Sequence, residues 1–123
     1  MADVVHLITD MLFASKVREA AKHVGLTIQG ARDPLSLTEA ARAARLVIVD
    51  LRVPRALEAL EALSGDPAAR AVPCVGFIDH ERTDVMDAAR ARGCGQVMAK
   101  GQCANALPKL LAGVLGTPPP AAA

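Results

Sequence analysis

The stretch LVIVDLRVP, residues 46–54, decides the fold of this chain. A run of four large aliphatic side chains cannot place alternate residues in water, so it is typical of a strand that is covered on both faces. Such strands occur in parallel sheets with helices on either side, and Asp50 then stands at the carboxyl end of a central strand. Ligands bind at that edge of open α/β sheets, because strand ends, loops and helix N-termini converge there. Asp50 is therefore a candidate functional residue, although an aspartate that only ends its strand fits the pattern equally well.

The length and charge of the chain fit one small domain. It has 123 residues, with 14 Lys plus Arg against 13 Asp plus Glu and a formal charge of +1. There is no basic run, so we expect neither nucleic acid nor a membrane surface as a partner. The apolar residues 4–8 are too few to cross a bilayer. We predict a folded domain over residues 1–116 and a disordered Pro/Ala tail over residues 117–123.

Three cysteines occur at positions that match no zinc-binding or CxxC spacing: Cys74, Cys94 and Cys103. Because no signal peptide is evident, we expect reduced thiols in a cytoplasmic protein. Small core residues are the simplest interpretation of all three.

Five apolar segments alternate with five amphipathic ones along the chain. This alternation implies a parallel sheet wound on both faces through right-handed crossovers, which is a flavodoxin-like fold with strand order 2-1-3-4-5. Ser36-Leu37-Thr38-Glu39 has the form of a capping box and predicts Ser36 as the N-cap of the second helix. The predicted strands are 3–10, 26–29, 46–50, 72–78 and 96–99, and the predicted helices are about 13–24, 36–44, 56–64, 79–92 and 104–115. We expect Val47 and Val49 to be among the most buried residues.

The carboxyl edge of this sheet gathers charged residues that are remote in sequence. Asp10, Asp50, Asp79 and Lys100 each follow a predicted strand. The chain has no glycine-rich phosphate loop of the P-loop or GxGxxG type, so it gives little support to nucleotide binding. His80 is the nearest candidate for a catalytic base, but a solvated histidine in a first helical turn is the simpler interpretation.

These residues resemble the receiver domains of two-component response regulators, over residues 4 to about 115. Asp50 with Pro54 four residues later resembles the phosphoacceptor segment of that family. Lys100 follows residues 97–99 as the active-site lysine of the family follows its fifth strand. Asp10 matches the second of the paired acids after the first strand.

The resemblance implies a role for each of these residues. Asp50 would accept a phosphoryl group, and Lys100 would contact its oxygens. Asp10, Asp50 and the backbone carbonyl of Arg52 would ligate Mg²⁺, which prefers oxygen ligands and neutralises phosphate charge. The chain would then be no enzyme beyond self-catalysed phosphoryl transfer to Asp50.

Four positions depart from the pattern of the family. Thr9 stands where the first acid is expected, so any Mg²⁺ binding should be weak. Ile78 replaces the hydroxyl residue that contacts the phosphoryl group, and Val97 replaces the aromatic residue that swings inward with it. Gly101 replaces the proline after the lysine. The acceptor chemistry is partly retained, while the switch positions are degenerate.

The favoured function is therefore a pseudo-receiver: a signalling module of a two-component or phosphorelay pathway that docks a partner protein, with phosphorylation at Asp50 weakened or uncoupled. The family resemblance suggests the fourth helix, fifth strand and fifth helix as the docking surface, residues 84–111. Met98, Leu107, Leu110 and Leu111 lie close together there, although ordinary helix packing explains most of these leucines.

Two alternatives stay open at this stage. The first is a conventional single-domain response regulator that is phosphorylated by a histidine kinase. The second is a small enzyme or flavin binder on a flavodoxin-like scaffold, because fold does not fix function. A histidine kinase and a second copy of the chain are further candidate partners.

Overall fold

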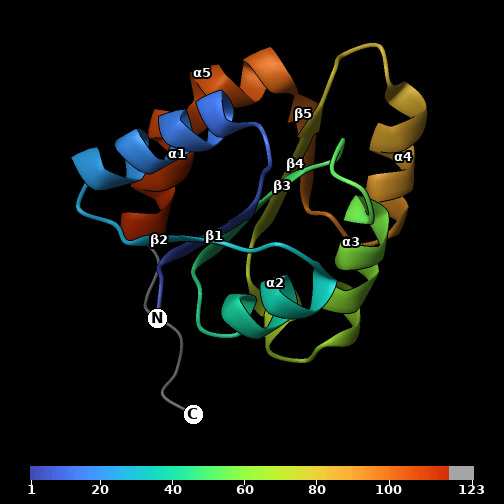
Figure 1. The fold of residues 1–123 in the computed structure, drawn as a ribbon, viewed down its shortest axis with the longest axis horizontal. Helices are drawn as coiled ribbons and strands as arrows, with labels where there is room; N and C mark the ends of the chain where they lie inside the picture. The colour runs from blue at the N-terminus through green and yellow to red at the C-terminus, as the bar shows by residue number, and fades with distance from the viewer. Residues whose placement is uncertain (117–123) are drawn as a thin grey trace.

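A computed structural model describes residues 1–116 as a five-stranded parallel sheet between two layers of helices (Figure 1). The strands are β1 (Val4–Leu7), β2 (Ile28–Gly30), β3 (Leu46–Asp50), β4 (Cys74–Ile78) and β5 (Gln96–Ala99). The helices are α1 (Met11–His23), α2 (Pro34–Ala41), α3 (Ala56–Gly65), α4 (Thr83–Ala91) and α5 (Lys100–Leu115), with a short 3-10 turn η1 (Ala69–Ala71). The sheet order is β2-β1-β3-β4-β5, which confirms the predicted flavodoxin-like topology. The predicted tail at residues 117–123 lies outside the described residues.

Strand β3 is apolar throughout because both of its faces are covered. Leu46 and Ile48 belong to the hydrophobic cluster under α1 and α5, while Val47 and Val49 belong to the cluster under α2, α3 and α4. Figure 1 shows the two groups of helices on opposite faces of the sheet. Val47 is 1% exposed and Val49 is 0% exposed, so the prediction of their burial is confirmed.

The start of α2 differs from the sequence prediction. Asp33, not Ser36, is the N-cap: its carboxylate accepts a hydrogen bond from the backbone N–H of Ser36 at 2.8 Å. The Ser36 hydroxyl accepts in return from the backbone N–H of Asp33 at 3.2 Å. The capping box is thus Asp33-x-x-Ser36, shifted three residues from the predicted one. Pro34 explains the shift, because its fixed φ and missing N–H suit the first helical position.

Two helices near the C-terminus also begin elsewhere than predicted. Helix α4 begins at Thr83, because residues 79–82 form a turn after β4. Helix α5 begins at Lys100 rather than Ala104, and Pro108 lies inside it. A start at Ala104 would put Pro108 near the first turn, where its missing hydrogen-bond donor is tolerated, but the helix accommodates Pro108 further along. Lys100 is consequently the first residue of α5, directly after β5.

None of the helices described within residues 1–116 combines the length and hydropathy that crossing a bilayer requires.

A charge placed on β3 should prevent folding. Val49→Asp would bury an unpaired carboxylate at a cost of several kcal/mol, which is a large part of the stability of a domain of this size. Leu35→Asp is the matched control, because Leu35 on α2 is 68% exposed. We expect the control to change stability by no more than about 0.5 kcal/mol. Urea unfolding followed by circular dichroism measures both variants, and a cooperative parent-like transition for Val49→Asp would contradict the assignment of β3 as the central strand.

His6 on β1 is buried, and no hydrogen bond within residues 1–116 replaces the contacts with water that its ring nitrogens lose. Its side chain is 4% exposed, and neither ring nitrogen has a hydrogen-bond partner among the described residues. It packs against Gly30 on β2, where a Cβ would lie 3.0 Å from the imidazole Cε1. Burial lowers the pKa of His6, and the positive charge of Arg18 lowers it further. The imidazole is therefore neutral in the folded protein at neutral pH.

This burial predicts a loss of stability in mild acid. The pKa of His6 is lower in the folded chain than in the unfolded chain. The contribution of the neutral imidazole to stability is therefore complete above the unfolded pKa of 6.5, and it is lost as the pH falls below 6.5. His6→Val removes the titrating group. We expect the free energy of unfolding of the parent to fall faster than that of the variant between about pH 7.5 and about pH 5. Parallel curves for the two proteins would show that His6 does not titrate in this range.

Candidate functional site

The candidate site lies where β1, β3 and β5 end. Asp50, the last residue of β3, is 1% exposed, and its Oδ1 accepts a hydrogen bond from the backbone N–H of Arg52 at 2.9 Å. Asp10 follows β1 and caps α1, accepting from the backbone N–H groups of Leu12 at 3.0 Å and Phe13 at 3.2 Å. The local turns thus hold both carboxylates by backbone bonds.

Lys100 is directed to Asp10. Its Nζ lies 2.7 Å from Oδ2 of Asp10 and 5.6 Å from the centre of the Phe13 ring. Phe13 stacks in turn on Phe77 of β4, with ring centres 4.4 Å apart. The hydrogen bond from Lys100 lowers the pKa of Asp10, and the bond from the Phe13 amide adds to the effect. Lys100 and Asp10 therefore form a charged pair that is held in place by packing on one side.

Arg52 spans the two carboxylates with its side chain. Its guanidinium Nη2 lies 3.6 Å from Oδ2 of Asp10, and its Nε lies 3.7 Å from Oδ1 of Asp50. The resemblance to receiver domains implied a role only for the backbone carbonyl of Arg52, and this side-chain contact was not predicted. The signal was available, because an arginine two residues after a buried strand-end aspartate lies within the turn that the aspartate caps.

The charges of this group balance without a metal ion. Asp10 and Asp50 supply two negative charges, while Arg52 and Lys100 supply two positive ones. No group of three or more His, Cys, Asp or Glu side chains within residues 1–116 is placed to share a metal ion. Because Mg²⁺ needs oxygen ligands and here meets one guanidinium and one ammonium group beside two carboxylates, the residues do not fit a tightly held Mg²⁺. The weak binding expected from the sequence stays a prediction.

The predicted switch positions are apolar and packed. Ile78 ends β4, is 2% exposed, and belongs to the cluster under α2, α3 and α4. Val97 on β5 is half-buried, is paired with Gly76 and packs against the same cluster. Neither side chain carries a hydrogen-bonding atom.

Two further residues named from the sequence lie beside the site. Asp79 and His80 line a cavity of about 320 Å³ together with Lys100. Both are exposed, and Nε2 of His80 lies 3.7 Å from a carboxylate oxygen of Glu81. His80 is thus exposed, as the simpler interpretation expected, but it lies in the turn before α4 rather than in the first turn of that helix.

The proposed docking residues on β5 and α5 are only partly at the surface. Leu107 is 4% exposed and Leu111 is 0% exposed, and both pack in the core under α5, so they cannot contribute to a surface. These two leucines occupy the buried stripe of an amphipathic helix, which confirms ordinary helix packing as the explanation for them. Met98 and Leu110 are half-buried and line a cavity of about 490 Å³ between β5 and α5.

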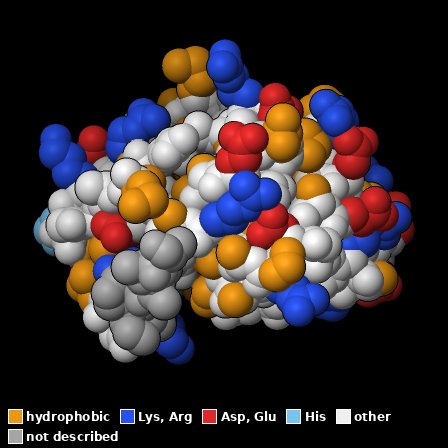
Figure 2. Space-filling model, turned by 90° about the horizontal axis from the view of Figure 1, so that it is seen from below, with side chains coloured by type: hydrophobic (Ala, Val, Ile, Leu, Met, Phe, Trp, Pro, Cys, Tyr) orange, Lys and Arg blue, Asp and Glu red, His pale blue; other side chains and the backbone are white. Residues whose placement is uncertain are grey.

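Charges of both signs are mixed on the molecular face seen in Figure 2. Lys and Arg side chains alternate there with Asp and Glu, with hydrophobic patches between them. This face therefore carries no extended basic surface of the kind that binds nucleic acid.

The structure has the fold of response-regulator receiver domains. It matches a receiver domain from Rhodospirillum rubrum with a TM-score of 0.75 and 18% identity, covering 95% of this chain and 96% of the other. The receiver domain of NtrX from Brucella abortus matches with a TM-score of 0.77 and 21% identity, covering 94% and 100%. A response regulator from Hahella chejuensis matches with a TM-score of 0.78 and 16% identity, covering 94% and 96%. No family model and no curated protein matches the sequence.

The arrangement of Arg52 predicts a specific metal-binding phenotype. Arg52→Ala keeps the backbone carbonyl and removes the guanidinium, with its positive charge, from between Asp10 and Asp50. We expect Mg²⁺ affinity to rise at least tenfold, about 1.4 kcal/mol. Thr9→Asp should also raise it by adding a hard ligand. Isothermal titration calorimetry measures the affinity, with Arg55→Ala as the control, because Arg55 pairs with Glu58 on α3. Tight Mg²⁺ binding by the unaltered protein would overturn this account of Arg52.

Proposed function

We propose that this chain is a receiver-like signalling module that docks a partner protein in a two-component or phosphorelay-related pathway. In this proposal, phosphorylation at Asp50 is weakened or uncoupled from the conformation of the docking surface. The only chemistry assigned to the chain is self-catalysed phosphoryl transfer to Asp50, and the compartment is the cytoplasm.

The observation that carries the proposal is the neutralisation of Asp10 and Asp50 by side chains of the chain itself. Lys100 lies 2.7 Å from Asp10, and Arg52 spans both carboxylates at 3.6 and 3.7 Å. Phosphoryl transfer is governed by electrostatic stabilisation of the transferred group. A site whose cations already pair with its carboxylates is less able to supply that stabilisation.

The packing of Ile78 and Val97 supports the uncoupling. A ligand shifts a two-state equilibrium only by the difference between its interactions with the two states. Ile78 offers no hydroxyl, which forfeits roughly 1.5 to 3 kcal/mol for a hydrogen bond to a charged group. Even a tenfold population shift requires about 1.4 kcal/mol of such coupling. The loss of this one contact is large enough to remove the response.

For the docking surface we propose the edge of the sheet at β5 with the exposed sides of α4 and α5. Strand β5 pairs only with β4 in the described sheet, so its other edge is open. Met98 and Leu110 provide half-buried apolar surface beside that edge. This combination is suited to a protein partner or to a second copy of the chain.

A conventional response regulator is the second candidate function. Asp50, Asp10 and Lys100 lie at one edge of the sheet, which favours it. Under this alternative a histidine kinase phosphorylates Asp50, and the docking surface responds. A small enzyme or flavin binder is supported by no contact at the site.

The two candidates predict different responses to beryllofluoride, a phosphoryl mimic. The measurement is the amide NMR spectrum of two variants with and without the mimic. The first variant is Thr9→Asp, and the second is Thr9→Asp combined with Ile78→Thr and Val97→Tyr. The metal ligands of the two proteins then match, and only the switch positions differ. We expect mimic-induced shifts in α4, β5 and α5 for the second protein and shifts confined to the neighbourhood of Asp50 for the first. Shifts across α4, β5 and α5 in the first protein, or in the unaltered chain, would favour the conventional regulator.

The docking of a partner is tested in parallel. Immobilised unaltered chain and Asp50→Asn should retain the same proteins from a cell extract to the same extent, because no phosphoryl group is needed. Met98→Glu should retain less, since it places a charge on the apolar surface of β5. A loss of binding in Asp50→Asn with no loss in Met98→Glu would contradict the proposal.

A further inference from the structure

Two thiols from different parts of the chain lie in contact at the edge of the sheet opposite Asp50. Cys74 begins β4, and Cys94 stands just before β5, with the two sulfur atoms 3.9 Å apart. The strands are direct neighbours, with Val75 paired to Gln96. Cys74 therefore lies opposite Gly95, and Cys94 is one residue away from direct pairing with Cys74. A small movement of the side chains would bring the sulfur atoms to bonding distance.

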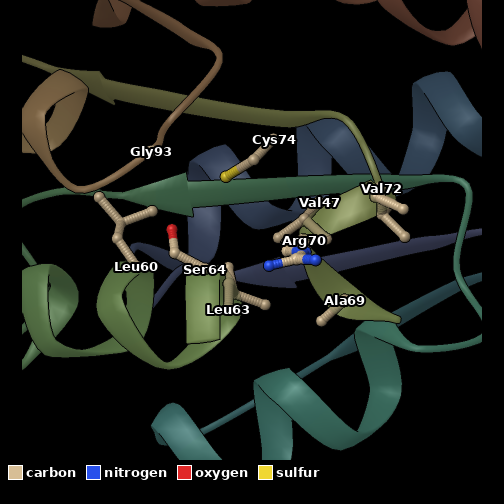
Figure 3. A pocket seen from close by; sticks show the side chains of 10 residues that line it. Val47, Leu60, Leu63, Ser64, Ala69, Arg70, Val72, Cys74 and Gly93 are labelled. Atoms are coloured by element: carbon tan, nitrogen blue, oxygen red, sulfur yellow. The ribbon is translucent and has the colours of Figure 1, made fainter. Parts of the chain in front are cut away.

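The pair is reached from solvent on the Cys74 side. Cys74 is half-buried and lines a cavity of about 460 Å³ together with Leu63, Ser64 and Gly93 (Figure 3). Cys94 is 6% exposed and lies behind it. A small molecule in this cavity would meet Cys74 first.

Gly76 makes room for the second thiol. A Cβ at Gly76 would lie 3.1 Å from Sγ of Cys94, which is closer than ordinary van der Waals contact. The Cys94 thiol also contacts the carbonyl oxygen of Gln96 at 3.2 Å. The glycine and this contact fix the Cys94 sulfur beside Cys74.

The two thiols differ in acidity as well as access. The hydrogen bond from the Cys74 thiol lowers the pKa of Cys94. The same contact, together with burial, raises the pKa of Cys74. Cys94 is therefore the better thiolate of the pair, and it is held against the sulfur that solvent reaches.

We propose that Cys74 and Cys94 form a reversible disulfide by exchange with a low-molecular-weight disulfide of the glutathione type. The Cys74 thiol, which solvent reaches, passes its proton to the neighbouring Cys94 thiolate and attacks one sulfur of the small disulfide. A mixed disulfide forms on Cys74, and the small thiolate that is released takes the proton back from Cys94. The Cys94 thiolate then attacks Sγ of Cys74 and expels the second small thiolate. The protein loses two protons and two electrons, and one small disulfide is reduced to two thiols. The reverse exchange with excess small thiol restores both cysteines.

A metal ion fits this pair less well than a disulfide does. Structural zinc requires four ligands, and no cluster of three or more His, Cys, Asp or Glu side chains occurs within the described part of the chain. Two thiols in contact with no further ligand are suited to oxidation.

Cys103 provides an internal comparison. It is 0% exposed in the core on the other face of the sheet, and burial raises its pKa to about 11. It has neither the access of Cys74 nor the acidity of Cys94. Cys103 should stay reduced under conditions that oxidise the pair.

The test is a count of free thiols after oxidation of the folded protein. The full chain is incubated with oxidised glutathione and quenched in acid. It is then labelled with a maleimide under denaturing conditions, and its intact mass is measured by mass spectrometry. We expect one labelled thiol instead of three, and peptide mapping should join Cys74 to Cys94. The matched control Cys103→Ala should form the same bridge and retain no labelled thiol.

Single variants resolve the order of the steps. Cys94→Ala should accumulate a glutathione adduct on Cys74, because the thiol that resolves it is gone. Cys74→Ala should react at least tenfold more slowly, since Cys94 is covered. A lasting adduct on Cys74 in the unaltered protein, three free thiols, or a bridge that forms only in urea would each overturn the proposal.

Discussion

The burial of β3 on both faces is the constraint on which the rest of the structure depends. Alternate residues of the strand enter two separate hydrophobic clusters, Leu46 and Ile48 on one side and Val47 and Val49 on the other. A strand of this kind must lie inside a sheet with helices on each side, which requires crossover connections and parallel strands. The same geometry carries Asp50 to the edge where β1 and β5 also end. The fold and the position of the site are thus one consequence of four aliphatic residues.

The candidate site at this edge of the sheet is defined by the groups that pair with its two carboxylates. Asp50 has its backbone bond to Arg52, Asp10 caps α1, and two cationic side chains complete the arrangement. Receiver folds at 16–21% identity cover nearly the whole chain, so the scaffold is shared while the residues differ. Ile78 is buried in the core, and the half-buried Val97 packs against it.

The sequence predicted the topology well because hydrophobic periodicity and strand ends are local signals. It placed Asp10, Asp50 and Lys100 at one edge, and the structure brings them there. It misplaced the cap of α2 and the start of α5, since a capping box and a proline each allow more than one register. The side-chain bridge of Arg52 and the contact between Cys74 and Cys94 depend on rotamers and on strand pairing. Such contacts join residues whose separation in sequence carries no periodic signal.

The guanidinium of Arg52 has a consequence for how the proposed signalling function would be regulated. A positive charge that is covalently attached does not dissociate, so the balance at the two carboxylates is independent of the supply of divalent ions. If the docking surface is likewise insensitive to Asp50, no turnover of a labile group limits how long the protein stays competent. The strength of its signal would then follow the number of copies present. Synthesis and degradation, rather than a kinase and its phosphatase, would set the level of output.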